Sequence, residues 1–103
     1  MSKGTPQPPA HLTAEAQEAW REVVEQHPRP KKITGPALDA YASTIALQRD
    51  AEARVQREGQ IIADERGTPV PHPAIEIARN ARHDVMRWAP QFAPAEDDDP
   101  LAF

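Results

Sequence analysis

The sequence contains no cysteine, so neither a disulfide nor a thiolate metal site can stabilise the chain. Its four glycines are scattered at positions 4, 35, 59 and 67, which excludes a glycine-rich phosphate-binding loop. No apolar run is long enough to cross a membrane, and no N-terminal stretch has the pattern of a secretory signal. We therefore expect a soluble, intracellular protein with no membrane partner.

Catalytic constellations are missing as well. The four histidines, at positions 11, 27, 72 and 83, fall on separate predicted elements and have no metal-ligand spacing. His27 lies on an apolar helix face, where a packed histidine is far commoner than a ligand. His72 precedes a proline and is better explained as a helix cap. The acidic run 97–99 is typical of a solvated tail. We predict no enzyme, no cofactor and no metal.

The chain has 12 prolines, clustered at 6–9, 28–36, 69–73 and 90–100. They leave about 75 residues for ordered structure, and so small a core contributes only a few kcal/mol of net stability. Self-association is the simplest source of further burial. The net charge of −4 argues against a general cationic coat for DNA.

The longest uninterrupted segment is 36–59, which has no internal glycine or proline and is rich in helix-forming residues. It predicts a helix roughly 33 Å long, with Pro36 at its first position and Gly59 just past its end. Its apolar residues fall on two stripes, and a surface helix of a monomer needs only one. The first stripe contains Leu38, Tyr41, Ala42 and Ile45, and the second contains Ala40, Leu47, Ala51 and Val55.

Two apolar stripes suggest that one packs on the chain itself and the other on a neighbouring copy. We assign the oligomer interface to Leu47, Ala51 and Val55. The core of the protomer is assigned to Trp20, Val24, Leu38, Tyr41, Ile45, Val85 and Trp88. The sequence leaves open the alternative in which the two stripes exchange roles.

Two further helices flank the long one. The first is predicted to begin after the N-cap Thr13, because apolar residues then recur at helical spacing until Pro28. After Gly59 the short segment 60–70 predicts a small β-hairpin. The third helix begins at Pro73, with His72 as its cap, and is expected to end at Pro90.

These elements predict a mainly all-α fold, a three-helix protomer with a long central helix that assembles into a ring. Residues 1–11 are expected to form an extended proline-rich arm and 12–92 the helical domain. Residues 93–103 are expected to be an acidic, disordered tail.

Helix, short turn and helix together invite a helix-turn-helix interpretation, with the second helix in the major groove. That helix has Asp39 and Asp50 beside Arg54 and Arg57 on its polar band, a poor surface for base contacts. The remaining cationic residues are weak when taken singly but would give a strong field when repeated around an oligomer. The predicted DNA contacts are Lys3, Arg29, Lys31, Lys32, Arg79, Arg82 and Arg87.

Four pieces of sequence, taken in order, resemble the small terminase subunits of tailed double-stranded DNA phages and prophages. They are PPAHLTAEAQEAW at 8–20, ITGPALDAYA at 33–42, REGQII at 57–62 and GTPVPHPAIEIARNA at 67–81. The last piece, a glycine-bearing hairpin followed by His-Pro and an alanine-rich helix, carries most of the likeness. Together the pieces span most of 8–92.

The resemblance implies a non-enzymatic, ring-forming packaging factor. Such a factor engages phage DNA and regulates the ATPase and nuclease of the large terminase subunit. It would act in the host cytoplasm during phage assembly and be absent from the mature virion. The chain departs from many relatives in having only Lys3 ahead of Pro8 and Pro9, and in its acidic tail. We interpret the apolar tail residues Pro100, Leu101 and Phe103 as a docking segment for the large subunit.

Two other functions fit the sequence. One is a small dimeric helix-turn-helix DNA-binding regulator, which differs from a ring in its mass in solution. The other is an adaptor that works only through its tail, for which DNA binding would be absent.

Overall fold

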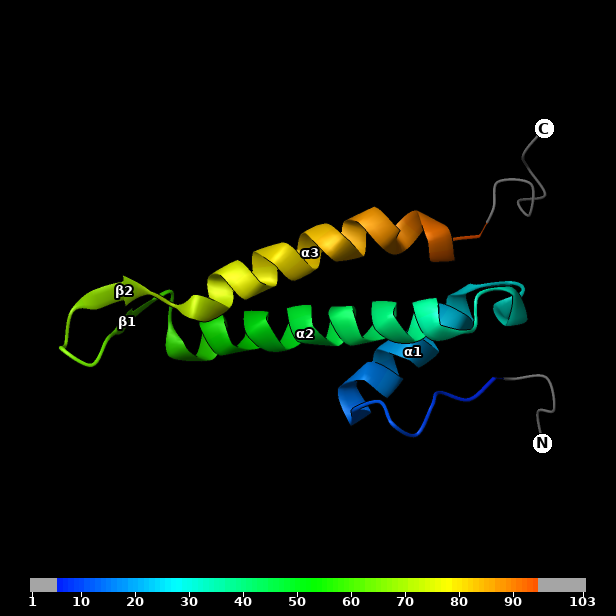
Figure 1. Ribbon diagram of the computed structural model, residues 1–103, viewed down its shortest axis with the longest axis horizontal. Helices are drawn as coiled ribbons and strands as arrows, with labels where there is room; N and C mark the ends of the chain where they lie inside the picture. The colour runs from blue at the N-terminus through cyan, green and yellow to red at the C-terminus, as the bar shows by residue number, and fades with distance from the viewer. Residues whose placement is uncertain (1–5, 95–103) are drawn as a thin grey trace.

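The computed structural model describes residues 6–94, which form three helices and one hairpin. The elements are α1 (Ala14–Gln26), the short 3-10 helix η1 (Pro30–Lys32), α2 (Pro36–Glu58), β1 (Ile61–Ala63), β2 (Pro69–Pro71) and α3 (Pro73–Phe92). The long helix α2 lies in the middle, with α3 running back along one side and α1 packed on the other (Figure 1). The mainly all-α prediction, including the hairpin before the last helix, is confirmed.

The helix ends follow their predicted signals. The Thr13 hydroxyl accepts a hydrogen bond from the Ala16 N–H at 3.1 Å, and Pro36 starts α2 directly after Gly35. Gly59 has φ = 96°, a region that other residues rarely adopt, and its N–H donates to the Val55 carbonyl at 2.7 Å. Each of these bonds satisfies a backbone group that a helix end leaves without an intrahelical partner.

The hairpin forms at the predicted place. β1 and β2 are antiparallel, with Ile62 opposite Val70. In the turn, the Asp64 side chain accepts the N–H groups of Arg66 and Thr68 at 2.8 and 2.9 Å. Gly67 has φ = 83°. The side chain of Asp64 and the freedom of Gly67 therefore shape a hairpin that projects beyond the end of α2 (Figure 1).

The main core lies where all three helices meet. Its buried residues include Trp20 and Val24 of α1, Leu38 and Tyr41 of α2, and Phe92 of α3. Leu38 is fully enclosed. The partly buried side chains packed around them include Ile45, Val85 and Trp88. Every residue that we assigned to the protomer core therefore lies in this cluster.

A second, smaller core joins the C-terminal half of α2 to the N-terminal half of α3. It consists of Ala51, Ala74 and Ala78, with Val55 packed against them. Because alanine side chains are short, they let the two helix backbones approach closely at this point. The first stripe of α2 therefore lies in the main core, while Ala51 and Val55 of the second stripe meet α3 of the same chain.

One prediction about the last helix needs correction. α3 does not end at Pro90 but continues to Phe92. Proline in the last turn removes one backbone hydrogen bond, and the burial of Phe92 against Tyr41 offsets that loss. Of the predicted oligomer interface, Ala51 is 2% exposed and Val55 is partly buried, and both pack against α3 of the same chain.

Candidate nucleic-acid and partner surfaces

Polar side chains bind α1 to α2 and fix the loop between them. The indole N–H of Trp20 donates to Asp39 at 3.1 Å. Glu22 accepts two hydrogen bonds from the Arg49 guanidinium, at 2.9 and 3.0 Å. The hydrogen bond from Arg49 lowers the pKa of the Glu22 carboxyl. With α1 held in this way, η1 and its basic residues have a fixed position at the start of α2.

Three of the predicted DNA contacts lie in this connection. Lys31 and Lys32 occupy η1 and are exposed. Arg29 precedes them, and its backbone N–H donates to the buried His27 ring at 2.9 Å. His27 is therefore a packed residue that orders the loop, as its apolar surroundings suggested. Lys3 lies outside the described residues.

The three arginines of α3 lie on its exposed sides, and two of them are already paired. Arg82 contacts Glu52 of α2 at 3.1 Å, and Arg87 contacts Asp84 at 3.0 Å. Arg79 lies near the start of α3. In Figure 1 the start of α3 and the α1–α2 connection lie toward opposite ends of α2. The predicted cationic residues of one protomer therefore do not form a single patch.

The packing of α2 argues against the helix-turn-helix alternative. A recognition helix must present one long face to the major groove. α2 has α1 on one side and α3 on the other (Figure 1). Asp39, in its first turn, is held by Trp20. The face of α2 that stays exposed is mixed in charge, because Asp50 is paired there with Arg54 at 3.0 Å.

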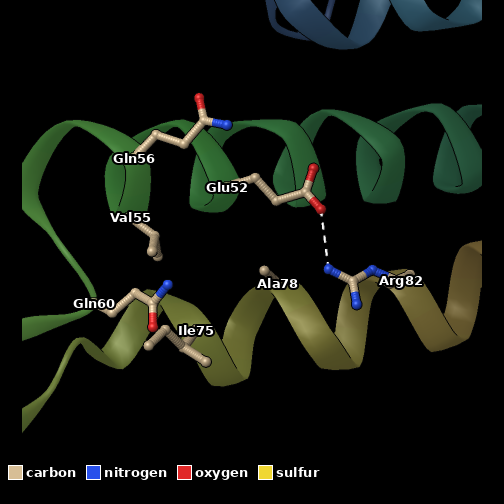
Figure 2. A pocket seen from close by; sticks show the side chains of 7 residues that line it. All are labelled: Glu52, Val55, Gln56, Gln60, Ile75, Ala78 and Arg82. Carbon is tan, nitrogen blue, oxygen red and sulfur yellow. Dashed lines mark hydrogen bonds and ion pairs between the residues drawn. The ribbon is translucent and has the colours of Figure 1, made fainter.

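An open groove of about 530 Å³ lies between α2 and α3. Figure 2 shows the Val55 side chain pointing from α2 toward Gln60 and Ile75 at one end, with Ala78 further along α3. The Glu52–Arg82 ion pair crosses the other end. Sequence reasoning did not find this groove, because it arises from the pairing of two helices distant in sequence.

The three predicted interface residues differ in how far they are exposed. Leu47 is 49% exposed, whereas Ala51 is buried and Val55 is partly covered. Leu47 and Ile77, which is 44% exposed, flank a small apolar groove of about 250 Å³ on the side of α2 and α3 away from Glu52. Leu47 thus keeps the surface position that the interface prediction requires. The tail residues Pro100, Leu101 and Phe103 lie outside the described residues.

A buried histidine joins the end of α2 to the start of α3. The His72 Nδ1 accepts the Ala74 N–H at 3.0 Å, so the predicted cap is confirmed. With Nδ1 accepting, the proton lies on Nε2, which donates to Glu58 at 2.9 Å. This hydrogen bond from His72 lowers the pKa of the Glu58 carboxyl.

Residues 6–94 contain no group of three histidine, cysteine or acidic side chains placed to hold a metal ion. Within the same range, no helix is both long and apolar enough to pass through a bilayer.

The comparison with protein families decides the broad assignment. The family model for the phage terminase small subunit matches residues 16–93, which include all three helices apart from the first two residues of α1, and the hairpin. The chain belongs to the phage terminase small subunit family. Membership gives it a role in phage DNA packaging. No curated protein and no solved structure matches the chain.

Proposed function

We propose that this terminase small subunit is a non-enzymatic packaging factor that forms a ring, engages phage DNA and regulates the large terminase subunit. The observation that carries the proposal is the family match over residues 16–93. The factor acts in the host cytoplasm during phage assembly and is not retained in the mature virion. It needs no cofactor.

The DNA contacts of this proposal centre on the α1–α2 connection. Lys31 and Lys32 are exposed on a short helix whose position is fixed by the His27 and Trp20 hydrogen bonds. One copy offers few positive charges and has acidic residues nearby on α1. Repetition around a ring multiplies these contacts, and each phosphate neutralised releases counterions and steepens the salt dependence. Lys3, Arg79, Arg82 and Arg87 are secondary candidates.

Replacing Lys31 and Lys32 together by alanine tests this assignment. We expect affinity to fall about equally for all DNA sequences, and the salt dependence of binding to become shallower, because phosphate contacts carry little sequence information. The matched control is Arg21→Ala with Arg66→Ala, which removes two exposed charges elsewhere. If both double variants weaken binding equally, only net charge matters and the assignment fails.

Oligomerisation is tested by light scattering on the purified chain, because a ring, a dimer and a monomer differ widely in mass. We propose that Leu47 faces the neighbouring copy, so Leu47→Glu is expected to break the assembly while the helical content stays unchanged. Ala53→Glu adds the same charge at another exposed position of α2 and is expected to be harmless. A dimeric wild-type chain would support the regulator alternative and refute the ring.

The tail completes the proposal. Pro100, Leu101 and Phe103 follow four acidic residues, and we propose that they dock on the large subunit. A chain lacking residues 94–103 is expected to form the same ring but to stimulate the ATPase of the large terminase subunit less. Undiminished stimulation of the large subunit would show that the tail is not needed for its regulation.

A further inference from the structure

One flank of α3 combines positive charge with exposed apolar surface. Ile75, Arg79, Arg82 and Met86 recur at intervals of four, three and four residues, which places them along one side of the helix. Met86 is 69% exposed. This flank borders the groove of Figure 2, to which Ile75 and Arg82 contribute directly. It therefore suits a segment that carries both acidic and apolar side chains.

The chain contains such a segment directly after α3. Glu96, Asp97, Asp98 and Asp99 precede Leu101 and Phe103. α3 ends at Phe92, and the helix rises about 21 Å between Ala78 and Phe92. Residues 95–103 reach at most about 30 Å when extended. The segment can therefore run back along α3 as far as the groove.

We propose that residues 95–103 of the same chain dock on this flank of α3. The acidic residues lie beside Arg82 and Arg79, and the apolar residues Leu101 and Phe103 occupy the groove against Val55, Ile75 and Ala78. The groove has room for them at about 530 Å³. In the tail, the acidic residues come before Leu101 and Phe103. On the way back along α3 from Phe92, Arg82 and Arg79 likewise come before Ile75.

Two acidic side chains accompany the two arginines at this flank. Glu52 also lines the groove, where it contacts Arg82 at 3.1 Å, and Glu76 lies on α3 one turn before Arg79. Arg82 therefore shares its charge between Glu52 and the tail, while Arg79 is exposed. Because the tail is covalently attached, its effective concentration at the flank is on the order of millimolar, and a weak docking contact is then enough.

Docking has a regulatory consequence, which rests on the proposed function. The acidic segment covers Arg79 and Arg82, two of the secondary DNA contacts. The groove meanwhile holds Leu101 and Phe103, which the large subunit would bind. When the large subunit binds the tail, both arginines become available to contact DNA. The tail segment 95–103 thereby couples DNA binding to recruitment of the large terminase subunit.

The absence of cysteine allows a direct test on the full chain. Ala102→Cys is combined either with Gln56→Cys, which lines the groove, or with Ala53→Cys, which is exposed on α2 outside the groove. Under mild oxidation we expect the 56–102 pair to form an intramolecular disulfide several-fold faster than the 53–102 pair. Mass spectrometry and a non-reducing gel identify the product. Circular dichroism checks that both variants fold.

Each result bears on the proposal. Equal rates for the two pairs would overturn docking, and cross-linked dimers in place of monomers would assign the groove to the tail of another copy. Replacing Asp97, Asp98 and Asp99 by asparagine in the 56–102 variant is expected to slow cross-linking and, without the cysteines, to raise DNA affinity several-fold. Unchanged affinity would overturn the regulatory part. A wild-type chain that binds no DNA would refute the proposed function and leave the cross-linking result intact.

Discussion

Phe92 stacks on Tyr41 with a ring-centroid distance of 4.5 Å and an angle of 18° between the ring planes. The pair joins the last turn of α3 to the first turns of α2, so it closes the end of the helical hairpin opposite to β1 and β2. Burial also raises the pKa of the Tyr41 hydroxyl. The stack explains why α3 extends two residues past Pro90.

The first prediction concerns this stack. We expect Phe92→Ala to lower the free energy of unfolding by about 3 kcal/mol, the lower end for a buried phenylalanine, because one side of its site is close to the surface. The last turn of α3 should also fray, because Pro90 then lacks compensation. Urea unfolding followed by circular dichroism measures the loss. Met86→Ala removes an exposed side chain and serves as the control, with a change within about 0.5 kcal/mol.

The second prediction concerns the alanine contact between α2 and α3. Ala78 is 5% exposed and packs with Ala51 and Ala74. Ala78→Leu inserts a larger side chain between closely packed helices, and we expect a loss of about 1–3 kcal/mol. Ala53→Leu makes the same change on the exposed side of α2 and should have little effect on the urea midpoint. Equal stability of the two variants would show that the helices can separate without cost.

The sequence was sufficient to predict the elements of this fold because their signals are local. Thr13, Pro36 and His72 each mark a helix start by their own chemistry, and Gly59 marks an end. The core assignments at Leu38 and Trp20 followed from helical periodicity. Each of these inferences needs only a few neighbouring residues.

What the sequence did not reveal depends on how the helices pair. Two apolar stripes on α2 are equally consistent with a second copy and with two flanking helices of one chain. Only the path of α3 shows that Ala51 is covered internally. The helix was expected to end at Pro90 because proline usually ends a helix, and the Tyr41 stack that holds Phe92 in α3 joins residues far apart in the chain. The groove bordered by Arg82 has the same origin.

The third prediction concerns the ion pair between α1 and α2. Arg49 and Glu22 form two hydrogen bonds but are 54% and 42% exposed, so water and salt screen their attraction. A double-mutant cycle with Glu22→Gln and Arg49→Gln is expected to give a coupling free energy of about 0.2–1 kcal/mol. The coupling should shrink as salt is raised. A coupling that persists unchanged at high salt would mean that packing, rather than charge, joins these side chains.

The last prediction concerns the pH dependence of the α2–α3 corner. The hydrogen bond from His72 depresses the pKa of Glu58 below its ordinary value of 4.5. A carboxylate whose pKa is lower in the folded than in the unfolded chain stabilises the fold above its unfolded pKa. That contribution is lost as the pH falls through the folded pKa. Glu58→Gln removes the titration but keeps an oxygen that can accept from Nε2 of His72.

We therefore expect the wild-type chain to have a higher Tm than Glu58→Gln at neutral pH, and the difference to shrink as the pH falls below about 4.5. Thermal melts from pH 7 to pH 3 provide the measurement. Glu65→Gln, which neutralises an exposed carboxylate of the hairpin turn, controls for the change in net charge. A Tm difference that is constant across this range would show that the negative charge of Glu58 contributes nothing to the corner.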